Sequence, residues 1–224
     1  MIIQIKLSVQ NCTYLRDPQE TKLGISIVKN SIELIDEIGF EAFTFKKLAV
    51  RTASTEASVY RYFENKQQLL LYLFSWYWAW MNYRVRSSTN HIPKIEEKLL
   101  VAMKLLISRM EDDDEFPFIN ERKLQQIIEQ EGIKSILTKN VDAFNKAGAF
   151  DNYKNLVGIL SEWVLYVNPS ISHPNMLITT IIEGAHLHHF FGDHLPRLTN
   201  NCNQKNTVEN FFVDMFKTLL INNK

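Results

Sequence analysis

The sequence has few of the residues that interrupt helices, because only seven of its 224 residues are glycine and six are proline. A chain rich in leucine, isoleucine, lysine and glutamate with so few breakers favours a helical fold. Cysteine is also scarce, and Cys12 and Cys202 lie far apart with no metal-ligand spacing of Cys or His around either one. This usage favours a reduced, cytoplasmic setting and predicts no metal site.

Long apolar runs are absent as well. No uninterrupted stretch approaches the ~20 residues that a membrane helix needs, and the first residues, MIIQIKLSV, are broken by Gln4 and Lys6. We therefore expect no membrane segment and no signal peptide core. The sequence also lacks a glycine-rich phosphate loop, a nucleophile elbow and a plausible catalytic triad. These absences predict no catalytic residues and no cofactor, and an enzyme remains only a weak alternative.

The helical pattern runs through almost the whole chain. Residues 1–16 alternate weakly and could form a short strand or a mobile arm. A helix is expected to begin with Asp17 as N-cap, Pro18 at its first position and Glu20 completing a capping box, and to end at Gly39. Later breaks indicate helices near 93–110, 119–130, 134–147, 152–167, 174–191 and 207–221. The predicted fold class is all-α.

Residues 44–66 combine two short helices with basic charge. Thr44 and Thr55 are expected N-caps of helices over 44–52 and 55–63, which together form a helix-turn-helix arrangement. Asn65, with Gln68 reaching back, opens a long third helix that runs to about residue 86. The stretch carries five basic and two acidic residues within a chain whose net charge is zero. Such a local surplus suits the phosphates of a DNA duplex.

The second short helix predicts specific roles. Tyr60, Arg61, Tyr62 and Lys66 are expected to hold DNA phosphates, and residues 55–58 at the helix tip are expected to reach base edges. An ordinary helical hairpin with packed tyrosines is the alternative, and composition alone would favour it. The full predicted DNA-binding set is Thr44, Lys46, Lys47, Thr55, Glu56, Ala57, Ser58, Tyr60, Arg61, Tyr62 and Lys66.

The stretch GFEAFTFKKLAVRTASTEASVYRYFENKQQLL closely resembles the DNA-binding domain of the TetR family of transcriptional repressors. The matching positions are Gly39-Phe40, Thr44, Leu48-Ala49, Tyr60-Arg61-Tyr62-Phe63, Lys66 and Leu69-Leu70, and the resemblance covers about residues 21–81. It departs from the family at the turn, where Ala53 replaces a common glycine. A positive φ at that position would cost energy. Glu56 also stands where a basic or polar residue is frequent.

We divide the chain into an N-terminal arm at 1–16, a helix-turn-helix DNA-binding domain at 17–66, and a helical regulatory and dimerisation domain at 67–224. The ligand-binding and dimerisation role of the last part is what the resemblance implies. It implies a transcriptional regulator, most simply a repressor, that binds a palindromic DNA operator as a homodimer and is released by a small effector. A module that binds only protein is a further alternative.

Two helices are candidates for the dimer interface. The helix over 174–191 is apolar on most sides, and the helix over 207–221 carries a stripe of phenylalanine and leucine. A helix that is apolar nearly all round must be covered twice, which a second subunit would satisfy, although a monomer with a thick core is the alternative. The predicted interface residues are Ile178, Ile182, Phe211, Phe212, Met215, Phe216 and Leu219.

Aromatic residues mark a candidate effector pocket. Trp76, Trp80 and Tyr83 share one helix face at i, i+4, i+7 spacing, and we expect that Trp76, Trp78 and Trp80 cannot all point inward. Core packing is the more common reason for such a stripe. The predicted pocket is formed by Trp76, Trp80, Tyr83, Trp163, Tyr166 and His186. It predicts a largely apolar effector, neutral or weakly polar and flat or lipid-like.

Two further patterns carry no site. Glu183, His186 and His189 have a spacing that can hold metal, but one helix supplies too few ligands. The acidic run EDDDE at 111–115 lacks the spacing of a calcium loop and is expected to be a solvated connection.

Overall fold

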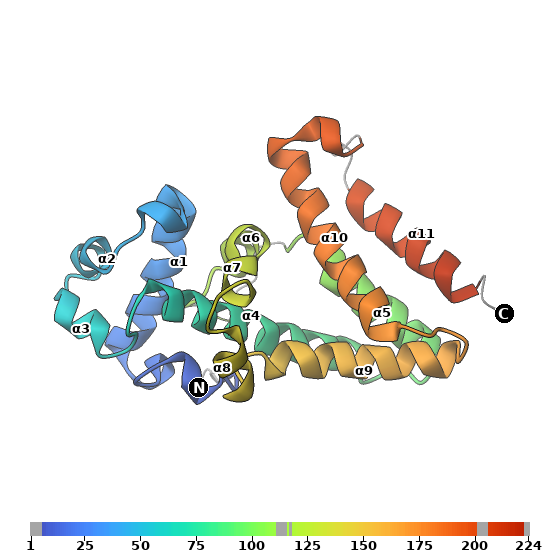
Figure 1. Cartoon of the computed structure of the whole chain (residues 1–224), viewed down its shortest axis with the longest axis horizontal. Helices are drawn as coiled ribbons and strands as arrows, with labels where there is room; N and C mark the ends of the chain where they lie inside the picture. The colour runs from blue at the N-terminus through green and yellow to red at the C-terminus, as the bar shows by residue number, and fades with distance from the viewer. Residues whose placement is uncertain (1–5, 111–115, 117, 201–205, 222–224) are drawn as a thin grey trace. The chain divides into compact units, whose positions relative to one another are not determined.

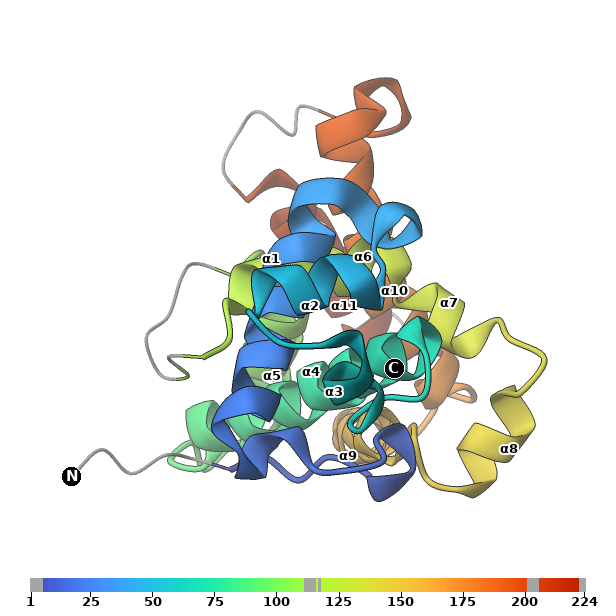
Figure 2. The same cartoon turned by 90° about the vertical axis from the view of Figure 1, so that its left-hand side faces the viewer.

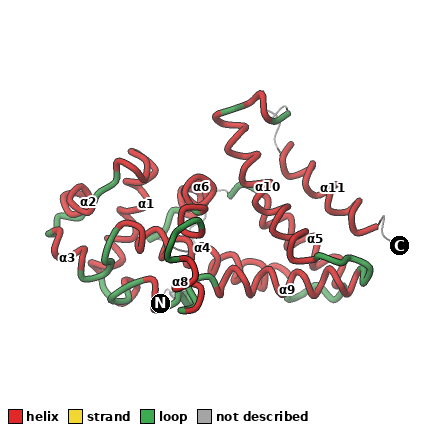
Figure 3. Tube along the Cα trace, viewed as in Figure 1, coloured by secondary structure: helices red, strands yellow, loops and turns green. Residues whose placement is uncertain are grey.

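The computed structural model describes residues 6–110, 116, 118–200 and 206–221. Within these ranges every regular element is a helix and no strand occurs, which confirms the predicted all-α class (Figures 1 and 3). The acidic run at 111–115 lies outside the described residues. None of the described helices is both long and apolar enough to cross a bilayer.

The chain forms two compact units. The first contains Met1–Ala79 and Met110–Asn152, and the second contains Trp80–Arg109 and Tyr153–Lys224. The helices of the first are η1 (Asn11–Thr13), η2 (Pro18–Glu20), α1 (Lys22–Ala42), α2 (Phe45–Arg51), α3 (Glu56–Tyr60), the start of α4 (Lys66–Thr89), α6 (Glu121–Glu131), α7 (Ile133–Ile136) and α8 (Val141–Lys146). Those of the second are the rest of α4, α5 (Ile95–Ile107), nearly all of α9 (Asp151–Val167), α10 (Pro174–His194), η3 (Pro196–Leu198) and α11 (Thr207–Ile221).

The start of the first long helix differs from the prediction. Asp17 caps only the 3-10 turn η2, and Thr21 is the N-cap of α1, accepting from the Gly24 amide at 2.9 Å. The turn folds tightly over α1, since a Cβ at Gly24 would lie 2.4 Å from the Pro18 carbonyl oxygen. The expected capping box with Glu20 therefore does not form. Residues 6–16 form no strand, and the predicted helix at 134–147 is divided into α7 and α8.

Helix α4 is covered on all sides. Trp76, Trp78 and Trp80 are each at most 1% exposed, so the expectation that they cannot all point inward was wrong. Segments distant in sequence cover the first half of the helix. The ring of Trp76 packs edge-on against Phe116, with centroids 5.4 Å apart. The rings of Tyr14 and Phe150 pack in the same way against Tyr72 and Phe74 of α4. A helix enclosed by neighbours can be apolar all round.

Ion pairs join α6 and α7 to α1. Lys123 of α6 pairs with Glu33 and, at 3.2 Å, with Asp36 of α1. The hydrogen bond to Glu33 raises the pKa of Lys123. Lys134 of α7 reaches Glu41 at 2.7 Å. The compact units consequently do not divide at residue 66, where the sequence places the functional boundary.

In the second unit, α10 packs against both α5 and α11. His189 is buried, and its Nε2 lies 2.7 Å from the Ile107 carbonyl oxygen of α5, so this nitrogen carries the proton and donates. On the other side Phe212 of α11 lies against Gly184, where a Cβ would be 2.9 Å from the ring. Glycine thus permits the close approach of these two helices.

Candidate DNA-binding site

Helices α2 and α3 begin at the residues that the sequence indicated. The Thr44 hydroxyl accepts from the Lys47 amide at 3.2 Å, and the Thr55 hydroxyl accepts from the Ser58 amide at 3.2 Å. The turn between them places Ala53 at φ +49°, in the left-handed region that glycine tolerates best. The departure from glycine at this position therefore carries the expected backbone strain.

Buried side chains hold the two short helices together. Leu48, Val59 and Phe63 are fully buried, and the ring of Phe45 packs edge-on against Tyr60 with centroids 5.1 Å apart. Figure 2 shows α2 in front of α1 and α3 below α2, in accord with the contacts of α2 with both helices. Because their inner faces are fixed in this way, α3 presents a defined outer face.

The outer face carries cations that stay available. Lys46 and Arg61 are exposed and form no ion pair within the described residues. Glu56 and Ala57 are exposed at the tip of α3, and Tyr60 is 47% exposed. These positions agree with a surface that meets phosphates and base edges.

Ser58 and Lys47 lie close to this face but have internal partners. Ser58 is half-buried, and its hydroxyl lies 2.8 Å from the Thr55 hydroxyl. The Lys47 ammonium donates to the Ala42 carbonyl at 2.8 Å. Either side chain would have to exchange its internal bond for one to DNA.

Two predicted phosphate anchors have internal roles in this structure. Tyr62 is only 3% exposed, and its hydroxyl lies 2.7 Å from that of Thr21. The Lys66 ammonium donates to the carbonyl oxygens of Phe40 and Glu41, each at 3.0 Å, and lies 4.9 Å from the Phe40 ring centroid. Both side chains thus fasten α1 to the segment around α3.

An acidic partner that sequence reasoning missed lowers the local charge. Arg51 binds Glu37 of α1 through its two terminal guanidinium nitrogens, Nη2 at 2.7 Å, and its Nε donates to the Asn30 side-chain oxygen at 3.3 Å. The hydrogen bond from Arg51 lowers the pKa of Glu37. Because Glu37 lies 14 residues before Arg51, only the fold brings them together. The available positive charge therefore rests on Lys46, Lys47 and Arg61.

These features form a helix-turn-helix arrangement, in which a short, capped helix displays its outer face beside Lys46 and Arg61, two cations without an ion pair among the described residues. Residues 27–73, which include all of α2 and α3, match the family described as "Bacterial regulatory proteins, tetR family". Residues 27–73 are therefore similar to the DNA-binding domain of that family, in agreement with the resemblance seen in the sequence.

Solved structures share the fold of nearly the whole chain. The fatty acid degradation regulator FadR from Bacillus halodurans is 17% identical over 90% of this chain and 96% of its own, with a TM-score of 0.61. FadR from Bacillus subtilis, solved with stearoyl-CoA, is 16% identical over 88% and 97%, with a TM-score of 0.62. AibR, solved with isovaleryl coenzyme A and operator DNA, is 18% identical over 88% and 97%, with a TM-score of 0.57. No curated protein sequence matches the chain.

The six predicted effector-binding residues are divided between the compact units. Trp76 belongs to the first unit, and the other five belong to the second. Trp80 is fully buried with Arg84 5.1 Å above its ring, whereas Tyr166 is 70% exposed and lies on the surface of the protomer. Tyr83 and Trp163 are half-buried. His186 is buried, and burial lowers its pKa to about 4.

The predicted dimer residues also separate into two groups. Ile178, Ile182, Phe212 and Phe216 are at most 4% exposed, on helices α10 and α11 that pack against each other and against α5. In the single chain they belong to the core. Phe211 and Leu219 are 58% and 39% exposed, and Met215 between them is half-buried. The part of the predicted face that remains open is this single stripe on α11.

Proposed function

We propose that the chain is a ligand-responsive transcriptional repressor that binds a palindromic DNA operator as a homodimer. The observation that carries the proposal is the outer face of α3, packed against α2 and flanked by Lys46 and Arg61, which are exposed and have no ion-pair partner in the part of the chain that the structure describes. The match of residues 27–73 to the TetR family supports the same role. An operator lies on the chromosome, so the protein would act in the cytoplasm.

The DNA contacts divide by chemistry. Lys46, Arg61 and the exposed hydroxyl of Tyr60 would bind phosphate oxygens and set the position of the domain. Glu56 and Ala57 at the exposed tip of α3 would meet base edges in the major groove. A carboxylate there accepts a hydrogen bond from the amino group of cytosine and repels phosphate, so Glu56 would contribute sequence preference more than affinity.

The stripe on α11 supports a homodimer. Phe211, Met215 and Leu219 recur at i, i+4, i+8, so they lie along one side of the helix. On α10, Leu187 is 50% exposed. Exposed apolar residues that share a helix side mark an interaction surface, and a two-fold dimer presents the same surface from both subunits. Two copies of α3 related by a two-fold axis match a palindromic site.

The proposed effector is a small molecule with an apolar acyl group. Stearoyl-CoA and isovaleryl coenzyme A accompany FadR of Bacillus subtilis and AibR in their solved structures. The half-buried rings of Tyr83 and Trp163 in the second unit offer aromatic surface of the kind that apolar ligands contact. The effector causes release of DNA only if it binds the conformation that does not bind DNA more tightly than the one that does. Equal affinity for both conformations would leave their equilibrium unchanged.

Titration of the protein onto its own upstream DNA by fluorescence anisotropy tests the proposal. Lys46→Ala and Arg61→Ala should each weaken binding to all DNA sequences. Each should also reduce, by about 1, the slope of the logarithm of the binding constant against the logarithm of the salt concentration. Lys146→Ala, an exposed cation on α8, serves as the matched control and should change neither. Stearoyl-CoA and isovaleryl-CoA are the first effectors to add. Binding that is indifferent to all three substitutions would refute the assigned DNA surface.

A further inference from the structure

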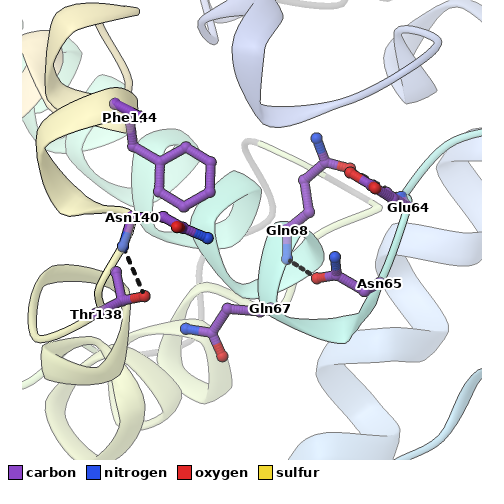
Figure 4. Close-up of a pocket in the computed structure, with 8 residues that line it drawn as sticks. Glu64, Asn65, Gln67, Gln68, Thr138, Asn140 and Phe144 are labelled. Atoms are coloured by element: carbon purple, nitrogen blue, oxygen red, sulfur yellow. Dashed lines mark hydrogen bonds between the residues drawn. The ribbon is translucent and has the colours of Figure 1, made fainter.

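A cavity of about 360 Å³ lies within the first unit, between the first turn of α4 and the segment that leads into α8 (Figure 4). It takes no part in the DNA-binding face or in the proposed effector site. In Figure 4 the ring of Phe144 and the amide of Asn140 extend from the α8 side toward Gln68 on α4. The lining residues are Glu64, Asn65, Gln67, Gln68, Thr138, Asn140, Ala143 and Phe144.

Hydrogen bonds to the backbone fix which atom each α4 amide leaves for a ligand. The Asn65 oxygen accepts from the Gln68 amide at 2.9 Å, and the Gln68 side-chain oxygen accepts from the Glu64 amide at 2.8 Å. Both side chains therefore keep their NH₂ groups as donors. Gln67 has the opposite orientation, because its NH₂ donates to the Lys134 carbonyl at 2.7 Å and leaves its oxygen as an acceptor. This side of the lining thus offers the NH₂ groups of Asn65 and Gln68 as donors and the side-chain oxygen of Gln67 as an acceptor.

The charge of the lining is limited to one group. Glu64 is the only ionisable residue among the eight, and no lysine or arginine lines the cavity. The neighbouring Lys66 and Lys134 are engaged with carbonyls and carboxylates of the first unit. A phosphate would therefore meet a carboxylate without a compensating cation in the lining, whereas amino and hydroxyl groups would find an acceptor in Glu64.

We propose that this cavity binds a purine nucleoside without a phosphate. Side-chain amides pair with the hydrogen-bonding edges of bases, as Asn and Gln do with adenine. The half-buried ring of Phe144 supplies a flat apolar surface on which a base stacks. Glu64 accepts from the hydroxyls of the sugar. The volume falls in the range of small-molecule sites.

The test is calorimetric titration of the full chain with adenosine, in the absence of DNA. Adenosine should bind saturably, and adenosine monophosphate should bind more weakly because of its phosphate. Phe144→Ala should weaken adenosine binding roughly 5- to 150-fold, the range that base stacking on an aromatic ring provides. Asp142→Asn changes an exposed residue of α8 outside the lining and should leave the affinity unchanged.

Glu64→Gln, at an exposed position, is the second test variant and keeps the experiment decisive if Phe144→Ala fails to fold. This substitution should lower the affinity for adenosine and reduce the difference in affinity between adenosine and adenosine monophosphate. The proposal is overturned if adenosine shows no saturable binding, if the monophosphate binds as tightly, or if neither variant changes the affinity. Because no DNA is present, the outcome is independent of the proposed repressor function.

Discussion

Replacing Lys66 separates a structural role from a DNA-binding role. The two hydrogen bonds from its ammonium to the Phe40 and Glu41 carbonyls join the end of α1 to the start of α4. In Lys66→Met the side chain keeps its length and loses these bonds. We expect a loss of stability and no loss of a phosphate contact.

The magnitude follows from the contacts. A hydrogen bond from a charged donor contributes about 1.5–3 kcal/mol when desolvated. Here one bond is partly buried and the other exposed, so water replaces part of the loss. With about 0.5 kcal/mol from the ammonium above the Phe40 ring, the expected net cost is about 2 kcal/mol. For a chain of this size that corresponds to a fall of about 4–8 °C in the unfolding midpoint.

The assay compares Lys66→Met with Arg61→Met, whose side chain is exposed and unpaired among the described residues. Thermal unfolding should register only the first substitution, and the salt dependence of DNA affinity should register only the second, as a slope smaller by about 1. A Lys66→Met protein with an unchanged midpoint and a flattened salt slope would refute the reasoning and restore Lys66 as a phosphate anchor.

Three further predictions follow from single sites. Ala53→Gly should raise the free energy of unfolding by about 1 kcal/mol in urea titrations, since it removes the strain of φ +49°; an unchanged value would contradict this. Phe211→Asp or Leu219→Asp should yield helical monomers by light scattering, and a retained dimer would place the interface elsewhere. Burial lowers the pKa of His186 and His189 to about 4. The free energy of unfolding is therefore highest above about pH 6.5, where both side chains are neutral, and falls as the pH approaches 4. The loss is on the order of 3 kcal/mol for each histidine. Urea unfolding at pH 7.5 and 4.5 should show a smaller difference in a His186→Asn, His189→Asn double variant, and an equal one would contradict the assignment.

The helix starts were predictable because their signals are local. Thr44 and Thr55 accept hydrogen bonds from amides three residues later, as their types and positions indicate. Asn65 accepts from the Gln68 amide as an N-cap does, and the Gln68 side chain reaches back as expected, although it accepts from the Glu64 amide rather than from that of Asn65. At Asp17 the prediction failed for a local reason, since Asp17 caps the short η2 turn that packs on Gly24, and Thr21 after that turn is the N-cap of α1. An N-cap can be predicted from sequence where only one candidate precedes the helix; here Asp17 and Thr21 were both available.

Partners of the charged and aromatic residues were not predictable in the same way. Nothing near Arg51 in the sequence indicates that Glu37 neutralises it, so residue counts overstate the charge of the DNA-binding face. Tyr62 and Lys66 belong to a motif that resembles a phosphate-binding one, yet their polar ends are bonded inside the domain. Trp76, Trp78 and Trp80 can all be buried because α4 has no solvent-facing side at these residues. A helix that is apolar nearly all round is covered by neighbours on more than one side, and this holds for α4 as it was expected to hold for the helix over 174–191.

One cluster shows how the first unit couples segments that the sequence keeps apart. Lys134 of α7 pairs with Glu41 at the end of α1 and lowers its pKa by that hydrogen bond. The Lys134 carbonyl holds Gln67, and the Glu41 carbonyl holds Lys66, both in the first turn of α4. The end of α1, the start of α4 and α7 thus share four side chains. Because α2 follows α1 and α3 precedes α4, a shift of α7 must break these bonds or move the ends that carry both short helices. The ends of α1 and α4 that flank the two short helices are thus bonded to a residue 67 positions further along the chain than Gln67.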